Sequence, residues 1–154
     1  MDCGNPSGAT GLIMQVESEQ TASDLKSDRE TLEEKPITPL RILFVDDDAT
    51  IREAMVAILA WFGHDTISAA RGKEALDLYR SNKVDLVITD HYMPDMKGFE
   101  LAQHIRALNA DAKIILLTGW NNVEKEANSS FINFTLMKPV TMQTVLDTIQ
   151  SLFP

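Results

Sequence analysis

The chain has 154 residues, of which 44% are hydrophobic, so it is long enough for one domain with a buried core and a tail. Its 23 acidic residues outnumber the 14 basic ones and give a formal charge of −9, which excludes the basic surface typical of a nucleic-acid-binding protein. The single cysteine, Cys3, excludes an internal disulfide and a thiolate metal cluster.

The sequence also lacks the features of an exported or membrane-spanning chain. No basic region followed by an apolar stretch opens the N-terminus, so we expect no secretory signal. The longest apolar run, residues 54–62, has nine residues, whereas a membrane span needs about 20. We therefore expect a soluble, cytoplasmic protein that binds neither nucleic acid nor a membrane.

Residues 1–38 differ in composition from the rest of the chain. They contain eight acidic residues, three basic residues and no aromatic residue. Such a segment buries too little apolar surface to offset the entropy lost on ordering, so we expect a flexible acidic tail or linker. Within it, residues 23–35 are an alternative candidate for a short partner-binding helix. The folded domain is expected at 39–154.

The domain alternates short apolar runs with amphipathic stretches. The first run, Ile42 to Val45, is continuous and ends in acids, as a buried parallel strand does. The stretch after it repeats apolar residues at the spacing of one helix face and stops at Gly63. In chain order, the predicted strand and helix pairs are 42–45 and 50–62, 66–69 and 72–81, 84–89 and 99–108, 113–117 and 122–129, and 133–137 and 141–152.

This alternation predicts an α/β fold, with a parallel sheet, right-handed crossovers and helices on both faces. Ligands bind such sheets at the carboxyl ends of the strands. The residues at those ends are Asp46, Asp47, Asp90, Thr118 and Lys138. Clustered carboxylates repel one another, and Mg²⁺, which prefers oxygen ligands, relieves that conflict. A strand-end carboxylate could then attack a phosphoryl donor.

Four stretches carry a family resemblance: ILFVDDD, VDLVITDHYMPDMKGFEL, IILLTGW and LMKPV. In this order, each at a strand end, they resemble the receiver domain of two-component response regulators. The resemblance covers about residues 40–153 and implies a doubly wound, flavodoxin-like sheet of five strands in the order 2-1-3-4-5. It also implies a cis peptide bond between Lys138 and Pro139.

The resemblance implies a role for each residue of the site. Asp90 is the phosphoacceptor and also a ligand of Mg²⁺ or Mn²⁺. Asp47 binds the cation directly, Asp46 binds it through water, and the backbone carbonyl of Tyr92 is a further ligand. Thr118 and Lys138 supply the family's catalytic hydroxyl and ammonium groups. The implied function is a conformational switch phosphorylated by a histidine kinase or phosphotransfer protein, rather than a conventional enzyme; the output protein stays unidentified.

A signalling surface is expected around Trp120, Phe134, Thr135 and Pro139. The family often has an aromatic residue three positions before the lysine, and this chain has Thr135 there. Phe134 is one residue earlier, so its ring should face the opposite side of the strand. The interval from Thr118 to Lys138 is 20 residues, shorter than is usual in the family, which predicts a short helix at 122–129.

Two other functions remain as alternatives. Residues 46–50 also fit D-x-D-x-T, the nucleophile motif of haloacid-dehalogenase-like phosphatases. The domain could instead be an interaction module that works without phosphorylation. Among the flanking residues, we expect Asp48 to cap the first helix, and Trp61 and Phe62 to lie in the core. The three histidines are not expected to form a metal site.

Overall fold

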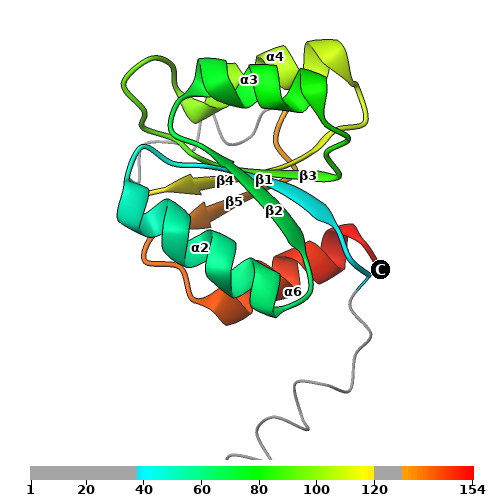
Figure 1. Ribbon diagram of the computed structural model, residues 1–154. Helices are drawn as coiled ribbons and strands as arrows, with labels where there is room; N and C mark the ends of the chain where they lie inside the picture. The colour runs from blue at the N-terminus through cyan, green and yellow to red at the C-terminus, as the bar shows by residue number, and fades with distance from the viewer. Residues whose placement is uncertain (1–37, 120–129) are drawn as a thin grey trace, which may run out of the picture. The chain divides into compact units, whose positions relative to one another are not determined.

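The computed structural model describes residues 38–119 and 130–154 (Figure 1). The predicted tail up to residue 37, the predicted helix 122–129 and Trp120 lie outside the described residues. The helices and strands are β1 Arg41–Val45, α2 Ala49–Trp61, β2 Asp65–Ala69, α3 Gly72–Ser81, β3 Leu86–Asp90, α4 Gly98–Leu108, β4 Lys113–Thr118, β5 Phe134–Met137 and α6 Met142–Leu152.

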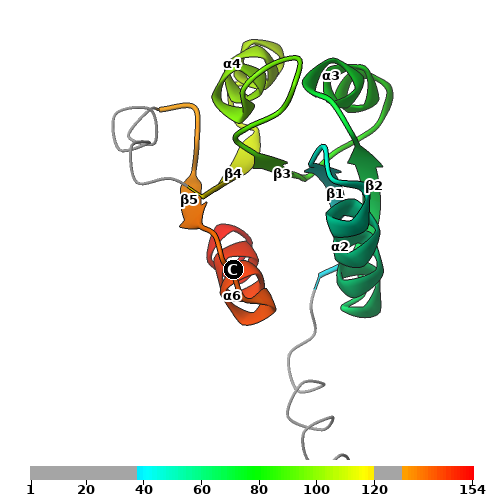
Figure 2. The ribbon, with the colours of Figure 1, turned by 90° about the vertical axis from the view of Figure 1, so that its left-hand side faces the viewer.

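The strands form one parallel sheet in the order β2-β1-β3-β4-β5, which confirms the predicted topology. Among the described helices, α3 and α4 cover one face of the sheet and α2 and α6 cover the other (Figures 1 and 2). All the carboxyl ends of the parallel strands therefore lie along one edge, where the candidate site residues were expected.

Each face of the sheet has its own core. In β1, Leu43 and Val45 pack in the core that includes residues of α3 and α4, whereas Ile42 and Phe44 pack in the core that includes residues of α2 and α6. Successive strand side chains point to opposite faces, and both faces are covered by helices. This double burial explains why the strands are continuous apolar runs in the sequence.

Helix α2 spans Ala49–Trp61, so it begins and ends one residue earlier than predicted, between the expected cap and the expected glycine. The carboxylate of Asp48 accepts hydrogen bonds from the backbone N–H groups of Thr50 and Ile51, which confirms it as the N-cap. Past the other end of the helix, Gly63 has a φ of 88°, a left-handed conformation that glycine adopts without strain.

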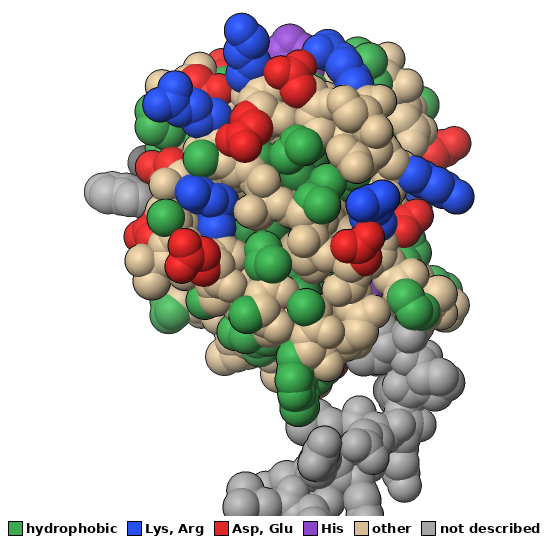
Figure 3. All heavy atoms as spheres, viewed as in Figure 1, with side chains coloured by type: hydrophobic (Ala, Val, Ile, Leu, Met, Phe, Trp, Pro, Cys, Tyr) green, Lys and Arg blue, Asp and Glu red, His purple; other side chains and the backbone are tan. Residues whose placement is uncertain are grey.

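The prediction for Trp61 was wrong, because its side chain is 65% exposed. Leu59 is fully buried, and a residue two positions further on lies about 200° around the helix, on the solvent side. In Figure 3, charged side chains gather over α3, whereas hydrophobic ones predominate over α2.

His64 is only 4% exposed, and its Nδ1 accepts a hydrogen bond from the N–H of Leu40 at 3.3 Å. Burial lowers the pKa of His64 below its usual 6.5.

The described helices contain no segment that is both long and apolar enough to cross a bilayer.

Candidate functional site

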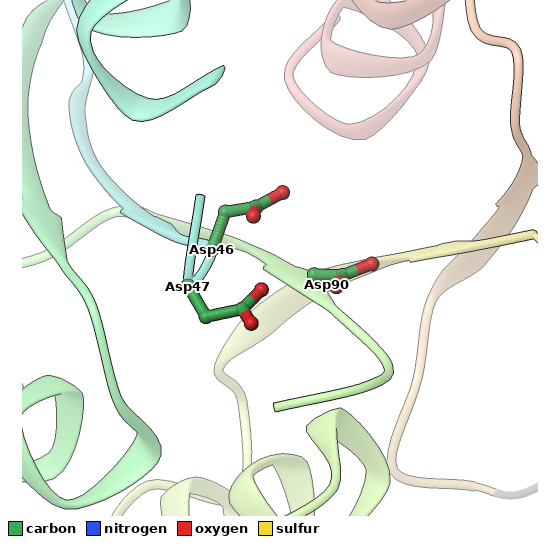
Figure 4. A group of neighbouring side chains, drawn as sticks. All are labelled: Asp46, Asp47 and Asp90. Carbon is green, nitrogen blue, oxygen red and sulfur yellow. The ribbon is translucent and has the colours of Figure 1, made fainter. Parts of the chain in front are cut away.

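The loops and strand ends at the carboxyl edge bring the predicted site residues together. Asp46 and Asp47 follow β1, Asp90 is the last residue of β3, Thr118 is the last residue of β4, and Lys138 follows β5. Figure 4 shows the carboxylates of Asp46 and Asp47 beside that of Asp90. One oxygen of each of these three carboxylates lies within 4.8 Å of the others, a spacing that one cation could bridge.

Asp46 is the most enclosed of the three acids, with 1% of its surface exposed. Its Oδ1 accepts a hydrogen bond of 2.9 Å from the N–H of Asp48, and its Oδ2 lies 3.5 Å from Nζ of Lys138. Burial raises the pKa of Asp46 above its usual value of 3.8, and the Asp48 bond and the Lys138 ammonium only partly oppose this rise.

Lys138 pairs with the predicted phosphoacceptor. Its Nζ is 2.9 Å from Oδ1 of Asp90, and its backbone N–H donates a 2.7 Å hydrogen bond to the carbonyl of Thr118. Burial alone would lower the pKa of Lys138, but the hydrogen-bonded carboxylate of Asp90 and that of Asp46 raise it. The peptide bond from Lys138 to Pro139 is cis, as the resemblance implied.

Lys138 pairs with the carboxylates of Asp46 and Asp90, so its one positive charge only partly neutralises the cluster of three carboxylates. Neighbouring carboxylates and burial both disfavour the ionised forms, and a divalent cation with oxygen ligands offsets both effects. The donor set, all carboxylate oxygen with no sulfur or imidazole, fits Mg²⁺ or Mn²⁺ rather than zinc. Among the described residues, this is the only group of three or more acidic, histidine or cysteine side chains that could hold a metal ion.

The loop between β3 and α4 carries Tyr92, whose side chain is 49% exposed. At the base of the loop, Gly98 donates a 2.8 Å backbone hydrogen bond to the carbonyl of His91. A Cβ at Gly98 would lie 2.3 Å from the carbonyl oxygen of Asp90, so only glycine lets α4 begin this close to the end of β3.

The residues of the predicted signalling surface differ in exposure. Thr118 is fully buried, whereas Phe134 is 41% exposed. Thr135 is half-buried, and within the described part of the chain its buried hydroxyl has no hydrogen-bond partner. Pro139 is exposed. The position three residues before Lys138 therefore holds a small side chain, with no ring to pack behind Thr118.

The geometry does not support the phosphatase alternative. The second aspartate of that motif, Asp48, caps α2 with its carboxylate. That family also needs an acidic pair after the lysine. The only acid after Lys138 is Asp147, which lies in α6, is exposed and accepts a hydrogen bond from Gln143 of the same helix.

Sequence reasoning missed two residues that support the site. Arg52 donates a 2.7 Å hydrogen bond from Nη1 to the backbone carbonyl of Asp46. Asp95, in the β3–α4 loop, accepts hydrogen bonds from the backbone N–H groups of Gly72 and Lys73. In every case the partner is a backbone group, which the sequence does not distinguish from any other.

A family model for the response regulator receiver domain matches residues 42–150. The response regulator MprA of Mycolicibacterium vanbaalenii is 33% identical over 116 residues, covering 74% of this chain and 50% of that protein. The chain therefore spans about half the length of the MprA relatives that it matches.

Solved structures show the same similarity. The regulator TrrA of Thermotoga maritima, in complex with Mg²⁺-BeF, is 35% identical with a TM-score of 0.69, covering 74% of this chain and 99% of that one. A structure of TrrA in complex with the histidine kinase ThkA matches with 35% identity and a TM-score of 0.68, covering 75% and 99%. The chemotaxis regulator CheY4 of Vibrio cholerae is 30% identical with a TM-score of 0.69, covering 75% and 100%. This chain belongs to the response regulator receiver domain family.

Proposed function

We propose that this domain accepts a phosphoryl group on Asp90 in a reaction that depends on Mg²⁺ or Mn²⁺, and that it acts as a conformational switch. One observation carries the proposal: Oδ1 of Asp90 lies 2.9 Å from Nζ of Lys138, within a cluster of three carboxylates whose oxygens are within 4.8 Å of one another. A nucleophile, a cation site and a fixed ammonium group thus share one place.

The metal ligands are proposed from the same geometry. Asp47 and Asp90 would bind the cation directly, the enclosed Asp46 would bind it through water, and the backbone carbonyl of Tyr92 would complete the protein's share. When bound, the cation would offset the negative charge of the transferring phosphoryl group. That TrrA has been solved with Mg²⁺-BeF supports this assignment.

In the proposed transfer, a carboxylate oxygen of Asp90 attacks phosphorus and a new P–O bond forms. The bond from phosphorus to the donor breaks, and its electron pair stays with the leaving group. For a phosphohistidine donor the leaving group is an imidazole, which then takes up a proton. Lys138 neutralises charge on a phosphoryl oxygen, and Thr118 donates a hydrogen bond to another.

We propose a histidine kinase or phosphotransfer protein as the donor, in the cytoplasm. The complex of TrrA with the kinase ThkA supports this class of partner. The domain would then pass the signal on by protein contact through the surface around Phe134, Thr135 and Pro139, together with Trp120. In this role it is a switch that promotes its own phosphorylation, not an enzyme with a separate substrate.

The test is labelling by a small phosphoryl donor. With acetyl phosphate and Mg²⁺, the intact protein should gain the mass of one phosphoryl group, and a chelator should prevent the gain. Asp90→Asn should not be labelled, whereas Asp111→Asn, which removes an exposed acid beyond α4, should be labelled like the wild type. Wild-type protein that stays unlabelled, or Asp90→Asn labelled equally well, would refute the proposal. Full partner binding by Asp90→Asn would favour the interaction module instead.

A further inference from the structure

The β3–α4 loop, residues 91–97, is hydrogen-bonded to the rest of the domain at its base and at Asp95. At the base, the N–H of His91 donates to the carbonyl of Leu117 in β4 at 2.9 Å. Also at the base, the N–H of Gly98 donates to the carbonyl of His91 at 2.8 Å. Near its other end, the carboxylate of Asp95 accepts hydrogen bonds from the N–H groups of Gly72 at 3.0 Å and Lys73 at 2.9 Å. Tyr92, whose carbonyl is a proposed metal ligand, lies between the two attachments.

The second attachment is specific to Asp95. Gly72 and Lys73 are the first two residues of α3, and the residue before them, Arg71, makes no side-chain cap. Unsatisfied N–H groups at a helix start favour a carboxylate acceptor. Although burial opposes it, these backbone donors hold the pKa of Asp95 below its usual value, so the carboxylate is ionised at neutral pH.

A close packing contact accompanies these hydrogen bonds. A Cβ at Gly72 would lie 2.2 Å from Cγ of Met96, so the absence of a side chain at residue 72 lets Met96 lie against the start of α3. Met96 also packs against the core on the α3 and α4 face of the sheet. The loop is therefore docked on α3 by a polar and an apolar contact at adjacent residues.

The start of α3 is joined in turn to the loop that holds the acidic pair. The N–H of Asp46 donates to the carbonyl of Ala69 at 3.2 Å, and Ala69 ends β2 three residues before α3 begins. The segment 69–73 thus contacts both the β1–α2 loop, which holds Asp46, and the β3–α4 loop, which holds Tyr92. It sets the position of one loop relative to the other.

We propose that Asp95 is a positioning residue of the metal site, because its contact with α3 holds the Tyr92 carbonyl in place relative to the Asp46 and Asp47 carboxylates. This inference rests on the proposed function. A metal ligand on an unattached loop has to be ordered when the cation binds, and that ordering lowers affinity. Loss of the groups that orient metal ligands typically weakens binding by about 10- to 100-fold.

The test measures metal affinity directly, from the electron paramagnetic resonance signal of free Mn²⁺ titrated with the full chain. Asp95→Ala should raise the Kd for Mn²⁺ about tenfold, the lower end of the range for such groups. Asp95→Asn keeps one carbonyl acceptor and should raise the Kd less. If the alanine variant folds poorly, the asparagine variant still measures the contribution of Asp95 to metal affinity.

Two control variants separate positioning from other effects. Thr141→Ala removes the N-cap of α6, a loss of stability away from the loop, and should leave the Kd unchanged. Asp77→Asn removes an exposed negative charge from α3 itself and should also leave it unchanged. A Kd raised equally by Asp77→Asn would mean that Asp95 acts through net charge alone.

A second measurement uses the reciprocity of coupled binding. If Asp95 links the metal site to α3, adding Mn²⁺ should slow hydrogen exchange at the amides of Gly72 and Lys73 in the wild type, and should not do so in Asp95→Ala. Mn²⁺ binding by the wild type and its loss in Asp47→Asn would show that the metal site is present. If the Kd of Asp95→Ala were then unchanged, this inference would be overturned and the proposed function would stand. Absence of Mn²⁺ binding by the wild type would overturn the proposed function as well.

Discussion

Replacing Gly98 with alanine should destabilise the domain and disturb the phosphorylation site together. The added Cβ would lie 2.3 Å from the carbonyl oxygen of Asp90 and 2.7 Å from Cδ1 of Leu116. The Leu116 contact can be relieved by a side-chain shift within the core. The Asp90 oxygen belongs to the backbone of a fully buried strand, so either β3 or the start of α4 has to move.

The magnitude follows from two opposing effects. Forcing an extra methyl group into a packed interior costs about 1–3 kcal/mol, and a backbone obstacle places Gly98→Ala near the upper end. Alanine is favoured over glycine within a helix by about 1 kcal/mol, and less at the first residue, where Gly98 stands. The free energy of unfolding should therefore fall by about 1–2 kcal/mol.

Urea unfolding followed by circular dichroism measures this change, and acetyl phosphate labelling of the same protein measures the site. Labelling of Gly98→Ala should be slower than that of the wild type, under conditions where both are fully folded. Gly119→Ala is the matched control, because no atom of the described residues lies within 4 Å of a Cβ placed there, and its unfolding midpoint should be unchanged or slightly higher. If Gly98→Ala were as stable as Gly119→Ala and were labelled at the wild-type rate, the close approach of α4 to Asp90 would be refuted.

Three further predictions concern stability. Asp48→Ala removes the N-cap of α2 and should lower the free energy of unfolding in urea by about 1 kcal/mol, with phosphoryl labelling retained; complete loss of labelling would place Asp48 in the site instead. Phe44→Ala empties a fully buried position against α2 and α6 and should lower the same quantity by about 3–5 kcal/mol; a loss below that of Asp48→Ala would contradict the packing. Because the folded state holds the pKa of His64 below 6.5, the unfolded state binds its proton more tightly, so the contribution of His64 to stability is fully present above that pH and is lost as the pH falls below it. His64→Gln should weaken that fall, and an identical pH dependence of urea unfolding in both proteins would contradict this assignment.

Most of the fold could be predicted because its signals are local. A run such as Ile42 to Val45 is apolar at every position because both faces of the sheet are covered, and helix faces repeat with the helical period. The end of α2 was harder to predict: Trp61 and Phe62 are neighbours of similar hydrophobicity, yet Trp61 is largely exposed. The hydrophobicity of the two residues did not indicate which side chain would be exposed. That depends on how the helix lies against the sheet.

The candidate site divides in the same way. Parallel strands with covered faces place their carboxyl ends on one edge, so Asp46, Asp90 and Lys138 were expected to meet from their positions in the sequence alone. The supporting contacts were not expected. Arg52 and Asp95 bind backbone groups, and any residue at the partner position offers the same N–H or carbonyl.

The sequence by itself determined the order of strands and helices along the chain and the edge of the sheet at which the acids gather. These follow from periodicity and from position along the chain, which are local properties. Only the tertiary structure decided that Lys138 pairs with Asp90, that His64 is buried, and that Asp95 caps a helix 22 residues earlier in the chain. Such partners are chosen by how separate segments pack in space, and that packing depends on the whole core rather than on any one stretch of sequence.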